Sequence, residues 1–437
     1  MKAKLSTQPY KGARDFYPDE MRIRNYMFET WKRVCKKYAF EEYDFPILEP
    51  LEIFSAKTGQ EIVNDQLFSF TDKGDRALAI RPELTPGTVR MIAQKFNELP
   101  KPIKWFMIGN NWRYEKPQTG RGREFYQLEC NIFGVDGVIA DFEIFSLIID
   151  IMREFGAEKE QFEVRFSDRK LLNALLKDTL QLDDELVLKV RRLMDKFKKM
   201  PEEAFVGAVS ELGLASEATA KVIEFLKSDF ENLAQVIPTD ILKANLGYIN
   251  LKQLTDLLDT YGLLQYCKFD PSIIRGFDYS DGLVYEVFDM NPNNRRSLFG
   301  GERFDKLIEI FGDYNLAATG FAMGDWTLTE FLKNWDLLPK QETTIEYFVT
   351  VWPGAEPKYL NKSLYLTQIL RNAGKSVFVW PYTGDKLDKQ LKYADKRSAK
   401  FALILGEEEI RNDTVTIKDL ASQKQNTVDT KEFLKLQ

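Results

Sequence analysis

Apolar and polar positions alternate along this chain with two different periods. Residues 22–39 place Met27, Trp31 and Val34 at the spacing of one helix face, whereas residues 66–71 and 78–81 are short runs with strand character. The segment between those two runs contains the turn signal Asp72-Lys-Gly-Asp75. We therefore expect a long helix, then an extended segment over residues 43–50, and then a hairpin.

Further along, strand and helix signals follow in an order that predicts one interrupted sheet. Residues 141–155 predict an amphipathic helix packed on the sheet, and residues 170–265 have helix-forming residues at 3.6-residue spacing with few strand signals. A further helix is expected from Phe304. Strands are expected at residues 104–108, 126–133, 283–288 and 317–323. A helical insertion would thus interrupt the sheet, which is completed afterwards.

The last part of the chain has a different texture. After a linker-like stretch at residues 337–344, strands and helices are expected to alternate. The segments are 346–352, 358–372, 377–380, 385–397 and 401–405. This order predicts a small parallel α/β domain.

Composition limits the class of protein. A chain of 437 residues should hold about three domains, and its 44% hydrophobic and 29% charged residues are typical of a globular protein. No apolar stretch reaches the length that crosses a bilayer, and the N-terminus lacks the apolar region of a signal peptide. We expect a cytoplasmic protein without membrane association. The three cysteines lack CxxC spacing, which argues against disulfides and a thiolate metal site.

The chain contains no histidine, and this restricts its chemistry. Ser-His and Cys-His dyads and most zinc sites are excluded, so any reaction must depend on carboxylates, Arg, Lys and bound ions. The net charge of −6 does not suggest a nucleic-acid partner. Residues 345–437, however, contain 15 Lys and Arg against 12 Asp and Glu, so a mildly basic module follows an acidic body.

The charged loop between the strands 104–108 and 126–133 concentrates guanidinium groups near an aromatic ring. Arg113, Arg121 and Arg123 suit a polyphosphate, because a planar guanidinium binds phosphate oxygens in bidentate fashion, and Phe125 offers a face for a purine. A hairpin with solvated surface arginines is the alternative that composition alone would favour.

The spacing Arg113-x-Glu115, then Arg121-x-x-x-Phe125, resembles motif 2 of the class II aminoacyl-tRNA synthetases. Other strings resemble the histidyl-tRNA synthetase family in particular, and they follow its order over nearly the whole chain. They are Gly12-Ala-Arg-Asp-Phe-Tyr-Pro18, Arg81-Pro-Glu-Leu-Thr85, Glu115-Lys-Pro-Gln118, Arg275-Gly-Phe-Asp-Tyr279, Gly300-Gly-Glu-Arg-Phe-Asp305 and Lys389-Gln-Leu-Lys-Tyr-Ala-Asp395.

This resemblance implies an α+β fold: a class II antiparallel-sheet catalytic core with a helical insertion, plus a C-terminal α/β anticodon-binding domain. The implied domains are residues 1–168 (catalytic core, first part, with motifs 1 and 2), 169–265 (helical insertion), 266–336 (catalytic core, second part, with the histidyl signatures and motif 3) and 345–437 (anticodon binding). It also implies a homodimer, because residues 22–39 and the strand that follows resemble motif 1, the family's dimerisation element.

The implied activity is ATP-dependent attachment of histidine to its tRNA through an aminoacyl-adenylate, with Mg²⁺ on the ATP phosphates. Arg113 and Arg275 would be the catalytic residues, because adenylation requires two anions to be aligned and charge on phosphate to be compensated. ATP binding is implied for Arg113, Glu115, Arg121, Arg123 and Phe125. Amino-acid binding is implied for Glu83, Thr85, Gln127, Asn131, Arg275, Tyr279, Ser280 and Phe304. No protein metal site is expected.

tRNA binding is implied for Gln118, Lys389, Lys392 and Lys396. The three lysines are spaced three or four residues apart and so share one helix face. The alternative is that this helix face is simply exposed to water and binds no partner. In a domain that resembles an anticodon binder, contact with tRNA phosphates is the better interpretation.

The sequence departs from the family pattern at several positions. The third motif ends as Gly324-Asp-Trp-Thr327 and lacks its arginine. In the amino-acid pocket, Asn131 replaces an acidic residue, and Ser280 and Phe304 replace two tyrosines, so contacts to an imidazole are weakened. On this view Asn131→Asp would restore an ionic partner for histidine. Two alternatives therefore stay open: a paralogue that activates a different small polar amino acid, and an inactive regulatory or tRNA-sensing paralogue.

Overall fold

The computed structural model describes residues 5–55, 65–118, 120–274, 281–294, 296–339, 345–354 and 356–435. The chain divides into two compact units, Met1–Leu338 and Pro339–Gln437. Each unit has its own hydrophobic clusters and is described by itself. In the described residues, no helix is long and apolar enough to cross a membrane.

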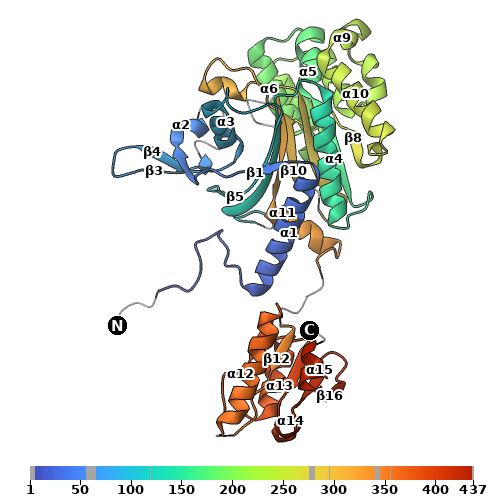
Figure 1. The fold of residues 1–437 in the computed structure, drawn as a ribbon. Coiled ribbons are helices and arrows are strands. Elements are labelled where there is room, and N and C mark those ends of the chain that lie inside the picture. The colour runs from blue at the N-terminus through green and yellow to red at the C-terminus, as the bar shows by residue number, and fades with distance from the viewer. Residues whose placement is uncertain are drawn as a thin grey trace. The chain divides into compact units, whose positions relative to one another are not determined.

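The N-terminal unit is built on one large mixed sheet with the strand order β1-β5-β6-β11-β10-β9-β7-β8 (Figure 1). Its strands are β1 (Glu41–Glu42), β5 (Ile103–Trp112), β6 (Glu124–Phe133), β7 (Phe162–Asp168), β8 (Cys267–Phe269), β9 (Leu283–Asp289), β10 (Ser297–Arg303) and β11 (Ala318–Gly324). The interior pairings are antiparallel, and the two edge pairings, β1 with β5 and β7 with β8, are parallel. The expected α+β class is confirmed, with β8 to β11 completing the sheet after the helical stretch.

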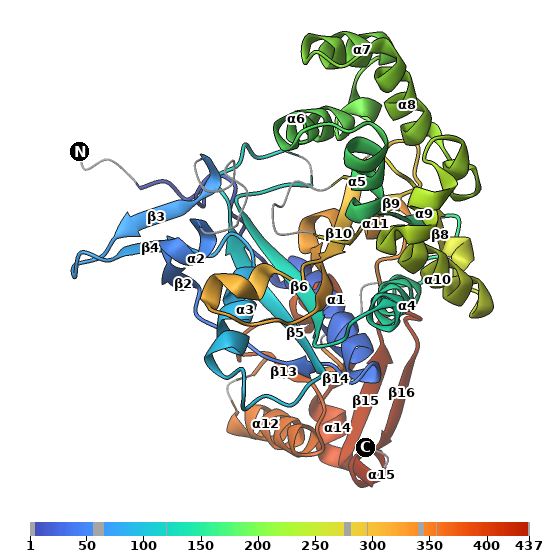
Figure 2. The same cartoon turned by 90° about the horizontal axis from the view of Figure 1, so that it is seen from above.

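One face of this sheet is covered by helices α1 (Pro18–Lys37), α4 (Val138–Glu154) and α11 (Asp325–Asn334). Trp31 of α1 and Ile148 of α4 are fully buried there, because their apolar stripes meet the inward side chains of the strands. Beside the sheet lies a smaller one, β2-β4-β3, with α2 (Leu51–Ser55) and α3 (Thr85–Gln94), as Figure 2 shows from above. Its strands are β2 (Leu48–Pro50), β3 (Phe68–Thr71) and β4 (Ala77–Ile80). The predicted hairpin is β3 with β4.

The stretch predicted as a helical insertion is helical throughout. Its elements are α5 (Arg169–Asn173), η2 (Ala174–Thr179), α6 (Asp184–Met194), η3 (Phe197–Lys199), α7 (Glu202–Glu211), α8 (Ser216–Lys227), η4 (Phe230–Gln235), α9 (Thr239–Ala244), α10 (Leu246–Thr260) and η5 (Leu264–Tyr266). Helix α10 packs on α4 and β7, so these helices share a core with the sheet and belong to the same compact unit.

The expectation of a helix from Phe304 is wrong. Residues Gly300 to Arg303 continue strand β10, and only a short 3₁₀ segment, η6 (Leu307–Phe311), follows. The reason is tertiary: residues 300–303 pair with β11, Phe304 N donates to Ala318 O at 2.8 Å, and Asp305 accepts the Ala318 N–H at 2.8 Å, so the chain stays attached to β11 beyond Arg303.

The C-terminal unit contains the predicted alternation of strands and helices, followed by an antiparallel extension. Its sheet has the order β13-β12-β14-β15-β16, in which β12 pairs in parallel with β13 and β14. The elements are β12 (Tyr347–Val349), α12 (Pro357–Asn372), β13 (Val377–Val379), α13 (Leu387–Lys396), β14 (Phe401–Ile404), α14 (Glu407–Asn412), β15 (Thr414–Asp419), β16 (Gln425–Asp429) and α15 (Thr430–Lys435). The sequence pattern did not predict the antiparallel pair β15 and β16.

Candidate active site

Strand β6 separates the core of the N-terminal unit from a polar surface. Successive side chains of a strand point to opposite faces, so its residues divide into two rows. Leu128, Cys130 and Ile132 face the core under α1 and α4. The alternate row, on the other face, lines a cavity and consists of Phe125, Gln127, Glu129 and Asn131.

Small residues on the neighbouring strand make room for this polar row. In the register of β11 with β6, Gly320 lies opposite Asn131, Ala322 opposite Glu129, and Gly324 opposite Gln127. A Cβ atom on Gly320 would lie 1.9 Å from Asn131 Oδ1, which is impossible without displacing the amide. The glycines of the third motif therefore shape the cavity, whatever else the motif does.

The cavity has a volume of about 310 Å³ and brings together most of the residues that the sequence predicted for ATP and amino acid. They come from β6, the start of α3 and the segment before it, the loop between β5 and β6, and the position just after β10, which are far apart in the chain. The predicted residues in its lining are Glu83, Thr85, Arg113, Glu115, Arg121, Phe125, Gln127, Asn131 and Phe304.

Cationic groups gather at the loop end of the cavity. Arg113 Nε donates to Pro82 O at 2.8 Å, and its guanidinium lies 5.3 Å from the centre of the Phe125 ring. Arg121 forms an ion pair with Glu115 at 3.0 Å and is more than half exposed. Both guanidiniums thus line the same cavity, and a nucleotide could lie between Arg113 and the Phe125 ring.

Two other predicted residues of this loop do not line the cavity. Arg123 packs its guanidinium 3.9 Å from the centre of the Tyr114 ring and donates to the Tyr10 hydroxyl at 2.5 Å. Gln118 accepts a hydrogen bond from Arg296 at 3.3 Å. Direct contact of Arg123 with ATP, and of Gln118 with tRNA, stay predictions.

The altered third motif has a structural use. Asp325 is buried, forms an ion pair with Arg14 at 2.6 Å, and accepts the backbone N–H of Tyr126 at 3.0 Å. Trp326 lies against Gly122, where an added Cβ would be 2.6 Å from the indole, and its Nε1 donates to Glu124 O. The Gly-Asp-Trp ending therefore ties together the N-terminal segment, β6 and the arginine loop.

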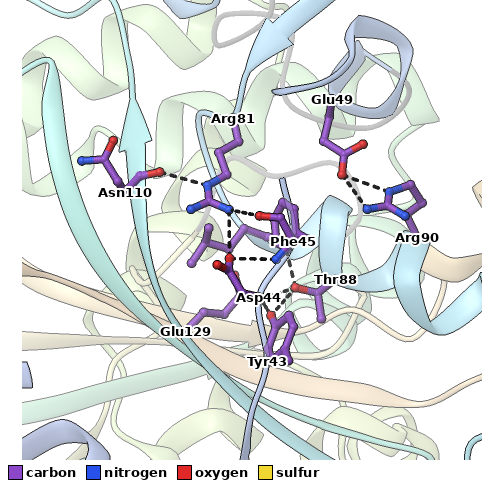
Figure 3. Close-up of polar contacts among 10 residues, drawn as sticks. Tyr43, Asp44, Phe45, Glu49, Arg81, Thr88, Arg90, Asn110 and Glu129 are labelled. Atoms are coloured by element: carbon purple, nitrogen blue, oxygen red, sulfur yellow. Dashed lines mark hydrogen bonds and ion pairs between the residues drawn. The ribbon is translucent and has the colours of Figure 1, made fainter. Parts of the chain in front are cut away.

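Glu129 is a buried carboxylate in the cavity wall, and sequence reasoning missed it. Thr88, Asn131 and Tyr43 donate to its Oε1 at 3.1, 2.5 and 3.4 Å, and Thr85 donates to Oε2 at 3.1 Å. Figure 3 shows Tyr43, Thr88 and Glu129 directed toward one another. Burial raises the pKa of Glu129 to about 7, although the hydrogen bonds from Asn131, Thr88 and Thr85 oppose the shift.

A sequence signal for Glu129 did exist. The string Gln127-Leu-Glu129-Cys-Asn131 alternates polar and apolar residues, and that places Glu129 beside two predicted pocket residues. Glu286, Glu302 and Trp326 also line the cavity and were not predicted. These residues come from β9, β10 and α11, and their distance from β6 depends on the order of the strands in the sheet.

The signature residue Arg81 is structural. It is buried and donates to Asn110 O at 2.9 Å and to Phe45 O at 2.7 Å, as Figure 3 shows. Burial lowers the pKa of its guanidinium, which the nearby Asp44 partly offsets. Arg81 thus fixes the segment that carries Glu83 and Thr85.

The remaining predicted residues lie elsewhere. Arg275, Tyr279 and Ser280 fall outside the described residues. Lys389 and Lys392 are exposed on α13 of the C-terminal unit, paired with Asp385 (2.8 Å) and Asp388 (2.9 Å), and Lys396 is exposed on the same helix. Over the described part of the chain, no three acidic or cysteine side chains are grouped as metal ligands.

Comparisons with known proteins cover both units. Residues 12–325 match the family model for histidyl-tRNA synthetase, and residues 348–436 match the anticodon binding domain. The chain is 42% identical to the histidine--tRNA ligase of Leptospira biflexa, over 99% of this chain and 97% of that protein. It is 35% identical to that of Opitutus terrae, over 96% of this chain and 95% of the relative.

A solved structure has the same fold. The crystal structure of histidyl-tRNA synthetase from Nostoc sp. PCC 7120 superposes with a TM-score of 0.83, at 23% identity and with 99% of both chains covered. The likeness therefore extends over both units, including the helical stretch 169–265 of the first.

Proposed function

This chain belongs to the histidyl-tRNA synthetase family, and we propose that the cavity on the face of β6 is where its ATP and histidine react. The enzyme uses ATP to attach histidine to tRNA by way of an aminoacyl-adenylate. Relatives with this activity in their name match nearly the full length, including the anticodon-binding unit, so neither a paralogue with another amino acid nor a regulatory subunit is favoured. The observation that carries the site is the convergence of Arg113, Glu83 and Gln127 on one cavity.

Adenylation joins two anions. The carboxylate of histidine attacks the α-phosphorus of ATP, a bond to the bridging oxygen breaks, and pyrophosphate leaves; a tRNA hydroxyl later attacks the adenylate and releases AMP. The attacking carboxylate is already ionised, so no general base is needed, which suits a chain without histidine. Arg113 would align the carboxylate with the α-phosphate and compensate the charge that develops on its oxygens. Arg275 would share this role.

ATP would extend from Arg113 along the loop. Its adenine would lie on Phe125, and Arg121 and Glu115 would exchange their mutual ion pair for contacts with the nucleotide. Arg121 can make this exchange because it is largely exposed, whereas Glu115 is mostly buried and its carboxylate would need the nucleotide as a replacement partner. Arg123 would act by holding the loop against Tyr10 and Tyr114.

The amino acid would occupy the deeper half. Glu83 would bind the α-ammonium group, since it is a nearly buried carboxylate in the lining, with Thr85 beside it. Gln127, Asn131 and Phe304 would surround the side chain. Tyr279 and Ser280 are proposed for this half on the resemblance alone.

Mg²⁺ is also part of the proposal, on chemical grounds. It would be held mainly by the ATP phosphates and water, because Mg²⁺ is usually bound through few carboxylates together with substrate phosphates. The cavity fits this arrangement, because Glu115, Glu286 and Glu302 line it, whereas the described residues contain no group of three acidic side chains arranged as metal ligands. The ion would neutralise part of the phosphate charge.

The partners proposed are tRNA and a second copy of this chain, in the cytoplasm. For tRNA, the support is the anticodon-binding match and the exposed lysines of α13. For the dimer, it is the likeness of α1 and the following strand to motif 1.

The test is single-turnover adenylate formation by Arg113→Ala and Arg275→Ala. We expect each to slow the step by about 100-fold or more, because losing a charge aligned with the transition state costs several kcal/mol. Arg397→Ala, in the C-terminal unit, is the matched control with unchanged adenylation. Rates within threefold of the wild type for Arg113→Ala would remove its proposed role.

A further inference from the structure

The cavity wall contains a buried carboxylate, Glu129, that has no role in the function proposed above. Asn131 stands where the family pattern has an acidic side chain, yet the same face of β6 supplies a carboxylate two residues earlier, at Glu129. Because strand residues i and i+2 share a face, Glu129 and Asn131 present their groups to the same volume. The Asn131 amide donates to Glu129 Oε1 at 2.5 Å, so the two side chains form one unit.

The two oxygens of Glu129 have different surroundings. Oε1 accepts from Thr88, Asn131 and Tyr43, whereas among the described residues Oε2 accepts from Thr85 alone. An ionised carboxylate can accept about four hydrogen bonds, two on each oxygen. Oε1 is thus fully used by the protein, and Oε2 keeps capacity for one more donor.

We propose that Glu129 Oε2 accepts the ring N–H of the substrate histidine and that Glu129 is the residue that selects the imidazole. This proposal rests on the histidine-charging function and assigns a residue to it. The strand register supports it, because Ala322 lies opposite Glu129 and Gly320 opposite Asn131, which leaves space over the carboxylate. A buried carboxylate with one free acceptor site discriminates strongly, because a substrate that lacks the N–H leaves that site unpaired.

The groups that face Glu129 set its titration. They are Glu83 from the segment before α3, Arg81 just after β4, and Tyr43 before β2; Cys130 is adjacent in the chain but points to the opposite face of β6. Burial raises the pKa of Glu129 to about 7, and Glu83 adds to the rise. Histidine should therefore bind the ionised form above pH 7, and affinity should fall as the pH drops below it, because the protonated carboxyl loses its charge-assisted acceptor.

The decisive variant is Glu129→Gln, assayed by histidine-dependent exchange of pyrophosphate into ATP. We expect the KM for histidine to rise between tenfold and a hundredfold, as for loss of a hydrogen bond to a charged group, while the KM for ATP stays within twofold. Glu49→Gln is the matched control. Glu49 is also nearly buried, but it pairs with Arg90 at 2.6 Å and does not line the cavity, so its loss should lower the melting temperature without changing the KM for histidine (Figure 3).

A second measurement needs no variant. 1,2,4-Triazolylalanine is a histidine analogue whose ring stays neutral between pH 5.5 and 8.5, so the pH dependence of its binding reports on the protein. Its affinity for the wild-type enzyme should be about tenfold lower at pH 6 than at pH 8, with the bend near pH 7.

Each outcome bears on the inference. A folded Glu129→Gln with an unchanged KM for histidine overturns it and leaves Glu129 as a structural carboxylate. If that variant does not fold, a flat pH profile for the triazole analogue overturns it, and a bend near pH 7 supports it. Absence of histidine-dependent exchange in the wild type would instead defeat the charging function itself.

Discussion

A hydrogen bond of 2.5 Å from the Asn131 amide to Glu129 changes how position 131 is understood. From the sequence, an aspartate there would restore an ionic partner for the substrate. In the structure it would place two carboxylates in contact inside a buried wall. Like charges at this separation cannot both ionise, so one would keep its proton.

At the residue scale we therefore predict that Asn131→Asp weakens histidine binding. The KM for histidine at pH 8 should rise about tenfold, and the melting temperature should drop. The carboxylate pair would have a folded-state pKa above its unfolded value, so this destabilisation is present at high pH and disappears as the pH falls. Thermal melts and pyrophosphate exchange at pH 6 and 8 measure both effects.

Asn232→Asp, an exposed change in the helical stretch, is the control for the added charge. Tighter histidine binding by Asn131→Asp at pH 8 would contradict the prediction and return position 131 to the role expected from the family pattern.

At the element scale, helix α11 begins beside the cavity and is joined there to the N-terminal segment. Asp325 at its first turn is almost fully buried and is paired with Arg14. Burial raises the pKa of Asp325, and the guanidinium of Arg14 opposes that rise. This buried ion pair therefore places a charged residue, Asp325, in the third motif, which lacks the family's usual arginine.

Arg14→Ala should lower the free energy of unfolding at pH 8 by about 2 kcal/mol, because it leaves a buried carboxylate without its partner. The folded-state pKa of Asp325 would rise further above its unfolded value, so the deficit should shrink as the pH falls toward 5. Urea titrations at several pH values provide the measurement. Arg153→Ala, which removes an exposed pair with Asp150, should cost less than about 1 kcal/mol. An equal loss in both variants would be inconsistent with the buried pair.

Helix α13 presents the lysine stripe that the sequence singled out. Two of its members are paired with aspartates one turn earlier, but such exposed pairs contribute little and can be exchanged for phosphate contacts. These pairs therefore do not oppose the proposed contact with tRNA, and the net charge of the helix is smaller than the lysines alone imply.

We predict that alanine at Lys389, Lys392 and Lys396 weakens tRNA binding and lowers its salt dependence, by up to roughly 0.7 to 0.9 log units for each phosphate that is no longer neutralised. Pyrophosphate exchange should be unchanged. Alanine at Lys424, Lys431 and Lys435, which are exposed just before β16 and on α15 of the same unit, removes equal charge and is the control. Equal salt slopes for the two triple variants would show that Lys389, Lys392 and Lys396 are only solvated and do not contact tRNA phosphates.

At the scale of the whole molecule, the candidate active site and the mildly basic anticodon-binding match lie in different units. The cavity lies entirely within Met1–Leu338, and the anticodon-binding match lies within Pro339–Gln437. On the proposed assignment of both sites, we expect mutations in different units to change activation and tRNA binding separately.

We predict that the protein is a homodimer that associates through its N-terminal unit. Sedimentation at micromolar concentration should give about twice the 50.8 kDa chain mass. A version ending at Leu338 should also sediment as a dimer, since the motif 1 likeness lies in α1 and in the extended segment 43–50. A full-length monomer that still charges tRNA would refute the proposal.

The sequence by itself determined much of the local structure. Helical spacing identified α1 and α4, the turn at residues 72–75 identified the hairpin, and the strand and helix order identified the parallel part of the C-terminal unit. These features depend on periodicity and turn chemistry, which are local. The family strings, in order, likewise located Glu83, Arg113 and Gln127, which line one cavity.

Only the tertiary structure decided what those residues meet. Whether Gly300 to Arg303 form a strand depends on their pairing with β9 and β11, and Arg303 also contacts Asp141, 162 positions away in the chain. That Glu129 is a hydrogen-bonded carboxylate in the cavity wall depends on the register of β6 with β11, and on Thr85, Thr88 and Tyr43 reaching it from other segments. Such contacts arise from packing between distant elements, and burial there sets the pKa of Glu129, so no local pattern could have shown them.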